Sequence, residues 1–185
     1  MKPSQEMFKE ITTQLKKIES NLKVDYMSTG ITRLLKFNLN LKEFKEYNSE
    51  LIKLLRKIEP NLRDKYLTYV GKGILFLKVN LEIFKELVTL LEQIEINNKT
   101  HVSIPLIGGL ISKMQEINLS VEIYKETTKQ LKKIDQSLRI YYLNNVFVNI
   151  LKKNPSLKEL KEYNLKLLKS LEKIAPNKRM HYLLS

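Results

Sequence analysis

A basic residue followed three positions later by a tyrosine recurs along the chain, and this pair has the best potential for chemistry. The basic residues are Lys23, Arg63, Lys99, Arg139 and Arg179, and the tyrosines are Tyr26, Tyr66, Tyr142 and Tyr182. Three of the five arginines occupy these equivalent places. Free N–H groups at a helix start and a guanidinium can converge on a ligand oxygen. One interpretation is therefore a repeated site that binds anions or a partner.

The same residues also have a structural interpretation. An acidic residue precedes the basic one by four positions in four copies, as Glu19, Glu59, Glu95 and Asp135. These charges predict a ladder of ion pairs instead of a ligand clamp. The tyrosines fall inside apolar stripes, which predicts core residues whose hydroxyl groups reach the surface. The two interpretations remain open at this point.

Other chemistry is scarce in this chain. It has no cysteine, and its two histidines, His101 and His181, are too far apart in sequence to suggest a metal set or a nucleophile relay. A Lys-Glu pair recurs on alternate helices and is interpreted as a solvated helix face. We expect no catalytic site, no metal and no cofactor. The sequence favours a protein that is not an enzyme.

The elements that position these residues follow a long repeat. Equivalent isoleucines lie 40, 36, 40 and 40 residues apart, at Ile18, Ile58, Ile94, Ile134 and Ile174. Apolar residues at helical spacing fill the segments between turns. The prediction is an all-α, right-handed α-solenoid of about five helical hairpins with a period near 39 residues. We expect one domain, 1–185, with repeats at approximately 4–39, 40–79, 80–118, 119–155 and 156–185.

Several helix boundaries can also be predicted. Asn21 is expected to cap the second helix, and capping boxes are expected from Asn40 to Glu43 and from Ser156 to Glu159. A shift of 116 residues aligns the second of these boxes with the first. The third repeat contains Pro105 and the pair Gly108-Gly109, which predict a shortened or displaced second helix with a local bend.

The turn Glu59-Pro60-Asn61-Leu62-Arg63 resembles the second-helix start of HEAT repeats. The resemblance extends over nearly the whole chain, although tyrosine stands where HEAT repeats usually have a small residue. It implies that the acid and base pairs lock neighbouring hairpins together. It also implies a scaffold or binding superhelix.

Charge and fold together suggest two functions. The net charge of +13, from 33 basic and 20 acidic residues, is typical of proteins with an anionic partner. The first prediction is an adaptor that binds another protein through its solenoid surface. The alternative is nucleic-acid binding along the basic and tyrosine stripe, with Lys16-Lys17, Arg56-Lys57, Lys132-Lys133 and Lys152-Lys153 on the same surface. Without a signal peptide or a transmembrane segment in the sequence, we expect a soluble intracellular protein.

The last predicted helix, from Asn177, is about half as long as its equivalents. It ends in Leu183-Leu184, so part of the preceding apolar stripe would stay uncovered. We therefore predict a C-terminal interface at Leu183 and Leu184. Its partner would be a second copy, another protein or further residues of the same chain.

Overall fold

The computed structural model describes residues 4–94, 103–114, 117 and 120–184, and these residues form helices and turns with no β-strand among them. The predicted all-α class is confirmed. The chain divides into two compact units, Met1–Val88 and Thr89–Ser185, where the sequence predicted a single domain. Within the described ranges, no helix has both the length and the apolar composition that crossing a bilayer requires.

One helix of each hairpin starts at a capped N-terminus. These first helices are α1 (Gln5–Leu15), α4 (Leu41–Arg56), α7 (Leu81–Leu91), α9 (Val121–Leu131) and α12 (Leu157–Lys173). Both predicted capping boxes are present, because Asn40 and Ser156 each accept from the backbone of a glutamate whose carboxylate binds back. α4 and α12 have 16 and 17 residues, whereas α1, α7 and α9 have 11 each. Two hairpins therefore have a first helix that is more than one turn longer.

Three second helices are composite, each with a π-helical segment between two short α-helical pieces. They are α2 (Lys23–Asp25), Tyr26–Ile31 and α3 (Thr32–Leu35); α5 (Arg63–Tyr66), Leu67–Gly71 and α6 (Lys72–Phe76); and α10 (Arg139–Tyr141), Tyr142–Phe147 and α11 (Val148–Leu151). A 3₁₀ turn precedes each one. The prediction that Asn21 caps such a helix is wrong, because Asn21 lies inside the turn Ser20–Leu22 and Glu19 holds the cap position. Asn21 stands just before the second helix in the sequence, and this position led to the wrong prediction of the cap.

The π-helical segments change which side chains face the interior. In each of them a backbone N–H bonds to the carbonyl five residues earlier, as Lys72 does to Leu67. The added residue rotates the rest of the helix, so buried positions come in adjacent pairs such as Tyr66 and Leu67. The second helix thus presents a broader apolar face than a single 3.6-residue stripe would give.

The third repeat does not contain the predicted interruption in its described part. Helix α8 (Ser103–Met114) runs without a break through Gly108 and Gly109. Pro105 lies in its first turn, where the missing N–H has no intrahelical partner to lose. The beginning of this repeat, 95–102, lies outside the described residues.

A left-handed residue ends three of the second helices. Asn38, Lys78 and Asn154 have φ values of 56°, 48° and 48°. Each stands two positions before the N-cap of the next first helix, so the connection between hairpins is very short. A connection of this length brings the next first helix back alongside the preceding hairpin.

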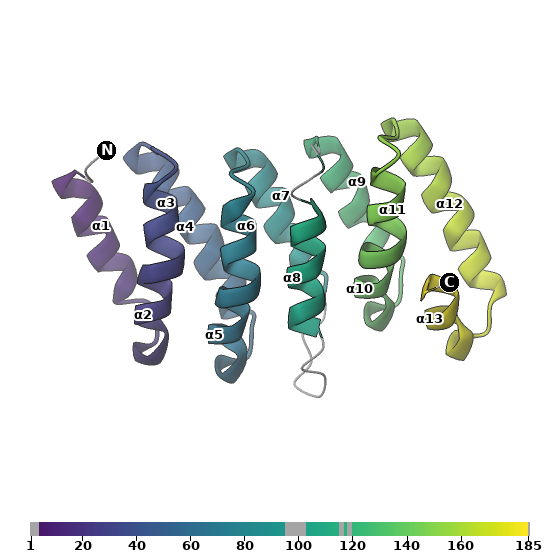
Figure 1. Cartoon of the computed structure of the whole chain (residues 1–185), viewed down its shortest axis with the longest axis horizontal. Coiled ribbons are helices and arrows are strands. Elements are labelled where there is room, and N and C mark those ends of the chain that lie inside the picture. Colours follow the sequence, from purple (N-terminus) through teal and green to yellow (C-terminus); the bar gives the residue numbers. More distant parts are fainter. Residues whose placement is uncertain (1–3, 95–102, 115–116, 118–119, 185) are drawn as a thin grey trace. The chain divides into compact units, whose positions relative to one another are not determined.

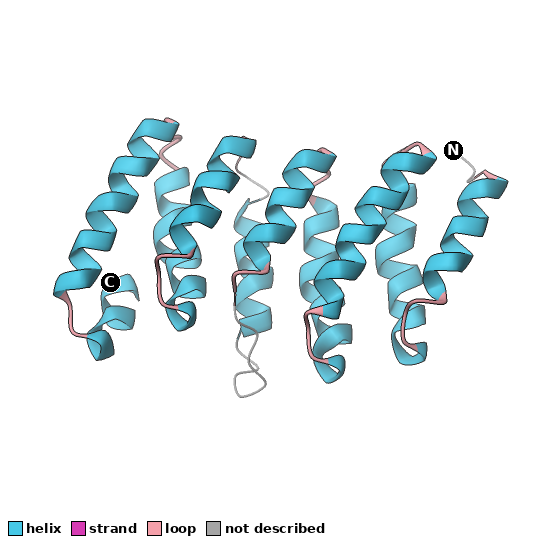
Figure 2. Ribbon diagram, turned by 180° about the vertical axis from the view of Figure 1, so that it is seen from behind, coloured by secondary structure: helices cyan, strands magenta, loops and turns pink. Residues whose placement is uncertain are grey.

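In the unit Met1–Val88, like helices lie beside like helices. α1 contacts α4, and the π-helical segment Tyr26–Ile31 contacts Leu67–Gly71 while α3 contacts α6. Figure 1 shows these second helices side by side in front, and Figure 2 shows the first helices from behind. The aromatic rings of Tyr47 and Phe84 pack edge to face at 4.9 Å, and the Tyr47 hydroxyl donates to the Val79 carbonyl at 2.7 Å.

Ion pairs also join these first helices. Lys45 Nζ lies 3.4 Å from a Glu10 carboxylate oxygen, and Lys85 Nζ lies 2.6 Å from one of Glu46. The hydrogen bond from Lys85 is the main reason that the pKa of Glu46 lies below its usual value. The recurring Lys-Glu pair was predicted to be a solvated face, and here it links neighbouring helices. In each pair, the lysine of one first helix lies beside the glutamate of the preceding first helix. The sequence did not reveal this proximity, because the two residues belong to different hairpins.

The unit Thr89–Ser185 has similar contacts of its own. α9 packs on α12, and the π-helical segment Tyr142–Phe147 contacts both α8 and α13 (Pro176–Leu184). Its core includes Tyr142, Phe147 and Leu160.

Candidate functional site

The arginine at the start of a second helix first binds its own hairpin. The Nε–H groups of Arg63, Arg139 and Arg179 donate to the carbonyls of Ile58, Ile134 and Ile174 at 2.8, 3.0 and 3.1 Å. These carbonyls lie just after the first helix, where backbone acceptors lack intrahelical partners. In these three hairpins, the repeated arginine of the sequence is therefore hydrogen-bonded to the backbone carbonyl of the repeated isoleucine.

The outer nitrogens of the same arginines reach the preceding hairpin. Arg63 Nη1 pairs with Glu19, and Arg179 Nη1 pairs with Asp135 at 2.9 Å. Each carboxylate lies 44 positions before its arginine, not the four positions considered in the sequence. These two arginines join neighbouring hairpins through ion pairs. Their donors are already occupied, so this geometry does not favour the anion clamp.

The other basic positions are less alike. Arg139 Nη1 donates to the Gln93 carbonyl at 2.9 Å. Lys23 is half-buried in α2 and forms no ion pair with a described residue. Lys99 lies outside the described residues.

Three of the four tyrosines are core residues, as predicted. Tyr26, Tyr66 and Tyr142 are fully buried, whereas Tyr182 is half-exposed. The Tyr26 hydroxyl donates to Asn48 Oδ1, and the Tyr142 hydroxyl donates to Asn164 Oδ1 at 2.5 Å. Burial raises the pKa of both phenols. Their hydroxyls bind a buried amide and do not reach the surface, which corrects that part of the prediction.

Sequence reasoning missed the two asparagines. Asn48 and Asn164 are buried and lie 116 residues apart, each within the apolar stripe of a long first helix. A polar residue that recurs at the same place in an apolar stripe is the signal that could have revealed them. The Nδ2 group of each is buried without a described partner.

Groups able to hold a metal are absent from the described part of the chain. No cluster of three histidine, aspartate or glutamate side chains occurs there. His181 is exposed, and His101 lies outside the described residues.

A hollow occurs beside each long first helix. The one in Met1–Val88 measures about 120 Å³ and is lined by Lys17, Ile18, Glu19, Leu22, Ile52, Leu55, Arg56 and Arg63. The one in Thr89–Ser185 measures about 290 Å³ and is lined by Lys133, Ile134, Asp135, Leu138, Leu168, Leu171, Glu172 and Arg179. A shift of 116 residues converts the first set into the second, position by position. The longer helix extends past its shorter neighbour and leaves this space.

A second hollow of about 470 Å³ adjoins the first in Met1–Val88. Its lining residues are Gln14, Lys17, Ser49, Ile52, Lys53, Arg56 and Lys57, and we call it the basic hollow. Four of these seven side chains are cationic and none is acidic. The adjoining hollow shares Lys17, Ile52 and Arg56 with it.

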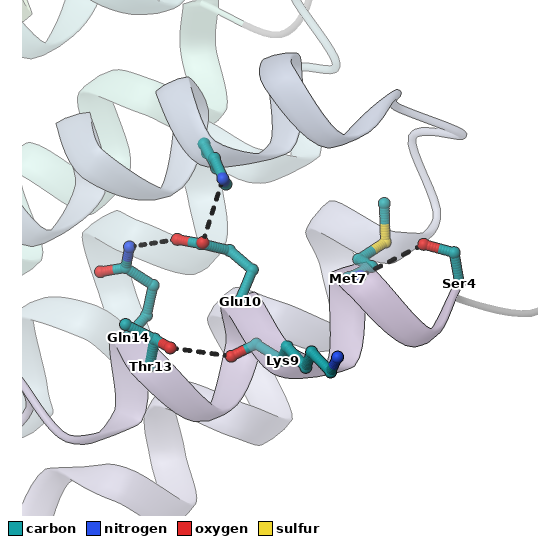
Figure 3. A network of polar contacts seen from close by, with 7 residues as sticks. Ser4, Met7, Lys9, Glu10, Thr13 and Gln14 are labelled. Carbon is teal, nitrogen blue, oxygen red and sulfur yellow. Dashed lines mark hydrogen bonds and ion pairs between the residues drawn. The ribbon is translucent and has the colours of Figure 1, made fainter.

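Two carboxylates close to the basic hollow in sequence bind residues that line it. Glu50 directly follows Ser49, and its carboxylate oxygen Oε2 lies 3.6 Å from Lys53 Nζ. Glu10 accepts from the Gln14 amide (Figure 3) and also pairs with Lys45. Lys17 and Arg56 are exposed and pair with no carboxylate of the described residues. Lys17 and Arg56 are therefore the cations of the basic hollow that carry positive charge without a described carboxylate partner, whereas Lys53 pairs with Glu50.

The equivalent place in Thr89–Ser185 has a different charge. Arg56 corresponds to Glu172, and Ser49 corresponds to Leu165. The cations of the basic hollow lie at the end of α1 and in the last turn of α4, where they also suit the helix dipole. Glu172 occupies the same place at the end of α12, so the helix itself does not require a cation there.

The predicted C-terminal interface is only partly at the surface. Leu183 of α13 is buried, and Leu184 is half-exposed. Of the α12 stripe, Leu160 and Leu171 are buried and Tyr163 is exposed. Exposed apolar surface of this hairpin thus lies on α12 as well as at Leu184.

No protein-family model, curated protein or solved structure matches this chain.

Proposed function

We propose that the chain is a non-enzymatic α-solenoid of HEAT-like hairpins, with a period near 39 residues, that binds an acidic segment of a partner protein. Lateral contacts between consecutive hairpins inside each unit support the solenoid. The proposed binding site is the basic hollow. Its four cations around one concave space, without an acidic lining residue, are the observation that carries the proposal.

Charge complementarity selects the occupant of the hollow. Lysine and arginine side chains around a concave surface suit carboxylates, and arginine can bind one with two parallel hydrogen bonds. The exposed Ser49 hydroxyl adds a polar contact for a peptide, whereas the buried Gln14 amide already donates to Glu10. The space accommodates a few side chains of an extended acidic segment.

The described titratable groups do not resemble an active site. The largest pKa shifts are those of Tyr26, Tyr124 and Tyr142, because burial in the core raises the pKa of each phenol. Of the carboxylates with lowered pKa values, Glu122 and Glu159 are exposed on helix surfaces and Glu46 is half-buried beside Lys85. Neither group combines a perturbed pKa with a cleft, which supports a binding role.

Nucleic-acid binding is the second candidate, and the net charge of +13 favours it. A nucleic-acid backbone presents phosphates at regular intervals, so its protein surface needs cations that repeat along the chain. The basic hollow does not repeat, because Glu172 replaces Arg56 in the equivalent place. This difference ranks a local acidic peptide ahead of a polyanion.

A binding titration separates the two candidates. The probes are a fluorescein-labelled hexaglutamate peptide and a labelled short duplex DNA. We expect saturable one-to-one peptide binding, weakened severalfold by Lys17→Glu and by Arg56→Glu. Lys133→Glu makes the same charge change at the equivalent place in Thr89–Ser185 and should leave binding unchanged.

The salt dependence decides between peptide and nucleic acid. Four phosphate contacts would reduce DNA affinity on the order of 100-fold between about 50 and 200 mM salt. If DNA binds more tightly than the peptide and shows this dependence, the nucleic-acid candidate replaces the adaptor. Equal effects of Lys17→Glu and Lys133→Glu would reject the basic hollow as the site.

A further inference from the structure

The aromatic contact between α4 and α7 joins one defined position on each helix. Tyr47 of α4, seven residues after the N-cap Asn40, packs on Phe84 of α7, four residues after the N-cap Asn80. Both rings are buried, Tyr47 at 4% exposure and Phe84 at 0%. In this contact we call the side of α4 with the tyrosine the donor face and the side of α7 with the phenylalanine the acceptor face; on α1, Ile11 stands at the tyrosine position.

An ion pair accompanies this aromatic contact. Lys85, five residues after its N-cap, pairs with Glu46, six residues after its own. Lys45 and Glu10 occupy the same two positions on α4 and α1. The acceptor face therefore consists of a Phe and a Lys, and the donor face of a Tyr and a Glu.

The structure leaves one acceptor face open. Phe8 of α1 is four residues after the N-cap Ser4, and it is 56% exposed where Phe44 and Phe84 are fully buried. Lys9, at the lysine position of the ion pair, is exposed and makes no ion pair with a described residue.

One donor face is open as well. Tyr163 of α12 is seven residues after the N-cap Ser156, and it is 43% exposed where its equivalent Tyr47 is 4% exposed. Glu162, at the glutamate position, is exposed and has no described ion-pair partner. Leu167, equivalent to the buried Leu51, is only half-buried on the same face.

We infer that two copies of this chain associate head to tail, with the α12 face of one copy on the α1 face of the next. Tyr163 of one copy packs on Phe8 of the other, and Glu162 pairs with Lys9. The proposed contact repeats the geometry of the Tyr47–Phe84 and Glu46–Lys85 pairs inside the chain. The occupant is a second copy because its exposed face has the side chains and charges that this contact uses.

The two faces are different, so the contact is heterologous. A copy that has used its α1 face still offers its α12 face. Association therefore continues to rods or closes to a ring, and the mean mass rises with concentration.

Two variants in one experiment test the proposal by light scattering after gel filtration. Phe8→Glu blocks the α1 face and Tyr163→Glu blocks the α12 face, both at exposed positions. Each variant alone should be a monomer of 21.9 kDa. Their equimolar mixture should form a species of twice that mass and nothing larger, because one open face of each kind remains.

Charge exchange provides a second measurement that does not alter the aromatic rings. Lys9→Glu and Glu162→Lys should each weaken association, and their mixture should restore it. Tyr69→Glu is the matched control, because Tyr69 is 56% exposed and lies on neither face. Lys17→Glu should also leave association unchanged, which separates this inference from the proposed peptide site.

Several outcomes would overturn the inference. They are a wild-type chain that stays monomeric up to its solubility limit, single variants that still associate, or a mixture that stays monomeric. Circular dichroism of each variant should match the wild type, and a face variant that unfolds is replaced by Phe8→Ser or Tyr163→Ser in the same mixing scheme.

Discussion

At the residue scale, the arginines at the second-helix starts join two hairpins through one side chain. Arg63 binds the Ile58 carbonyl through Nε and Glu19 through Nη1. Lysine has the charge but cannot make both contacts at once. This explains why arginine, a rare residue in this chain, occupies three of the five equivalent places.

We predict that Arg63→Lys lowers the free energy of unfolding by about 1 kcal/mol, because the Ile58 carbonyl loses its donor. Urea unfolding followed by circular dichroism measures the change. Arg56→Lys, an exposed arginine without an ion pair, is the control and should change stability by less than about 0.5 kcal/mol. Equal losses in both variants would refute the role of the Nε contact.

The buried pair of Tyr26 and Asn48 predicts a coupled effect. Tyr26→Phe leaves the buried Asn48 amide without its hydroxyl partner and should cost about 1–3 kcal/mol of stability. Asn48→Val copies Val88, the residue at the same place in α7. Because the double variant removes both polar groups, it should cost less than the sum of the single variants. A strictly additive cycle would mean that the hydrogen bond contributes nothing.

The sequence predicted which residues recur but not the partner of each one. Spacing within a turn suggested that Arg63 pairs with Glu59, whereas the structure pairs Arg63 with Glu19. A local pattern contains no information on a neighbour 44 residues away, because the packing of hairpins sets that distance. The sequence predicted Lys17, Arg56 and Lys57 on one surface, but it did not reveal that they line one hollow together with Lys53.

At the element scale, helix types and first-helix boundaries were accessible from sequence, and the π-helical segments were not. The 3.6-residue stripe predicts Leu62, Tyr66, Val70, Ile74 and Leu77 as inward-facing residues; the first four are buried and Leu77 is half-buried. Leu67 and Leu75 are buried too, because the segment Leu67–Gly71 rotates the chain by one added residue. Sequence periodicity assumes a regular helix and cannot place this insertion.

The left-handed residue before each first helix gives a simple prediction. Lys78 has φ 48°, a conformation that costs a residue with a side chain about 1 kcal/mol relative to glycine. We expect Lys78→Gly to raise the free energy of unfolding by up to about 1 kcal/mol. Asn38→Gly is the control, since asparagine adopts this conformation more readily, and it should change stability by only a few tenths of a kcal/mol. Thermal unfolding of the two variants, each compared with wild type, checks the difference.

The capping box of α12 makes stability depend on pH. The backbone N–H of Ser156, and then its hydroxyl, hold the pKa of Glu159 below its usual value. A carboxyl whose pKa is lower in the folded state stabilises the fold above its unfolded pKa. This contribution is lost as pH falls through the lowered folded value, below the ordinary value of 4.5.

We predict that Glu159→Gln, which cannot ionise, makes the urea midpoint less sensitive to acid below about pH 4.5. Unfolding series from neutral to acid pH measure this slope. Glu172→Gln is the control, because Glu172 is exposed and accepts no hydrogen bond among the described contacts. An unchanged slope in Glu159→Gln would show that the box does not couple to protonation.

At the scale of the whole molecule, the proposed solenoid implies that stability is local. Each hairpin contacts its neighbours in a stack, so a substitution affects distant hairpins weakly. We predict that Tyr26→Phe increases amide hydrogen exchange within 4–88 and leaves 120–184 unchanged. Tyr142→Phe, the equivalent change in Thr89–Ser185, should give the reverse pattern. Equal loss of protection in both units would indicate one cooperative core and would reject the proposed solenoid.

The unequal lengths of the first helices have a consequence for how such a chain can vary. The aromatic and ion-pair contacts of α4 lie near its start, and its additional turn extends beyond them. A four-residue insertion at the far end of a first helix therefore leaves these contacts near its start in place and nearly keeps the angle of the following turn, whereas one or two residues would rotate that turn. Insertions and deletions among related sequences should accordingly occur in steps of one helical turn at this end. Each step would create or remove a hollow and leave the contacts near the start of the helix unchanged.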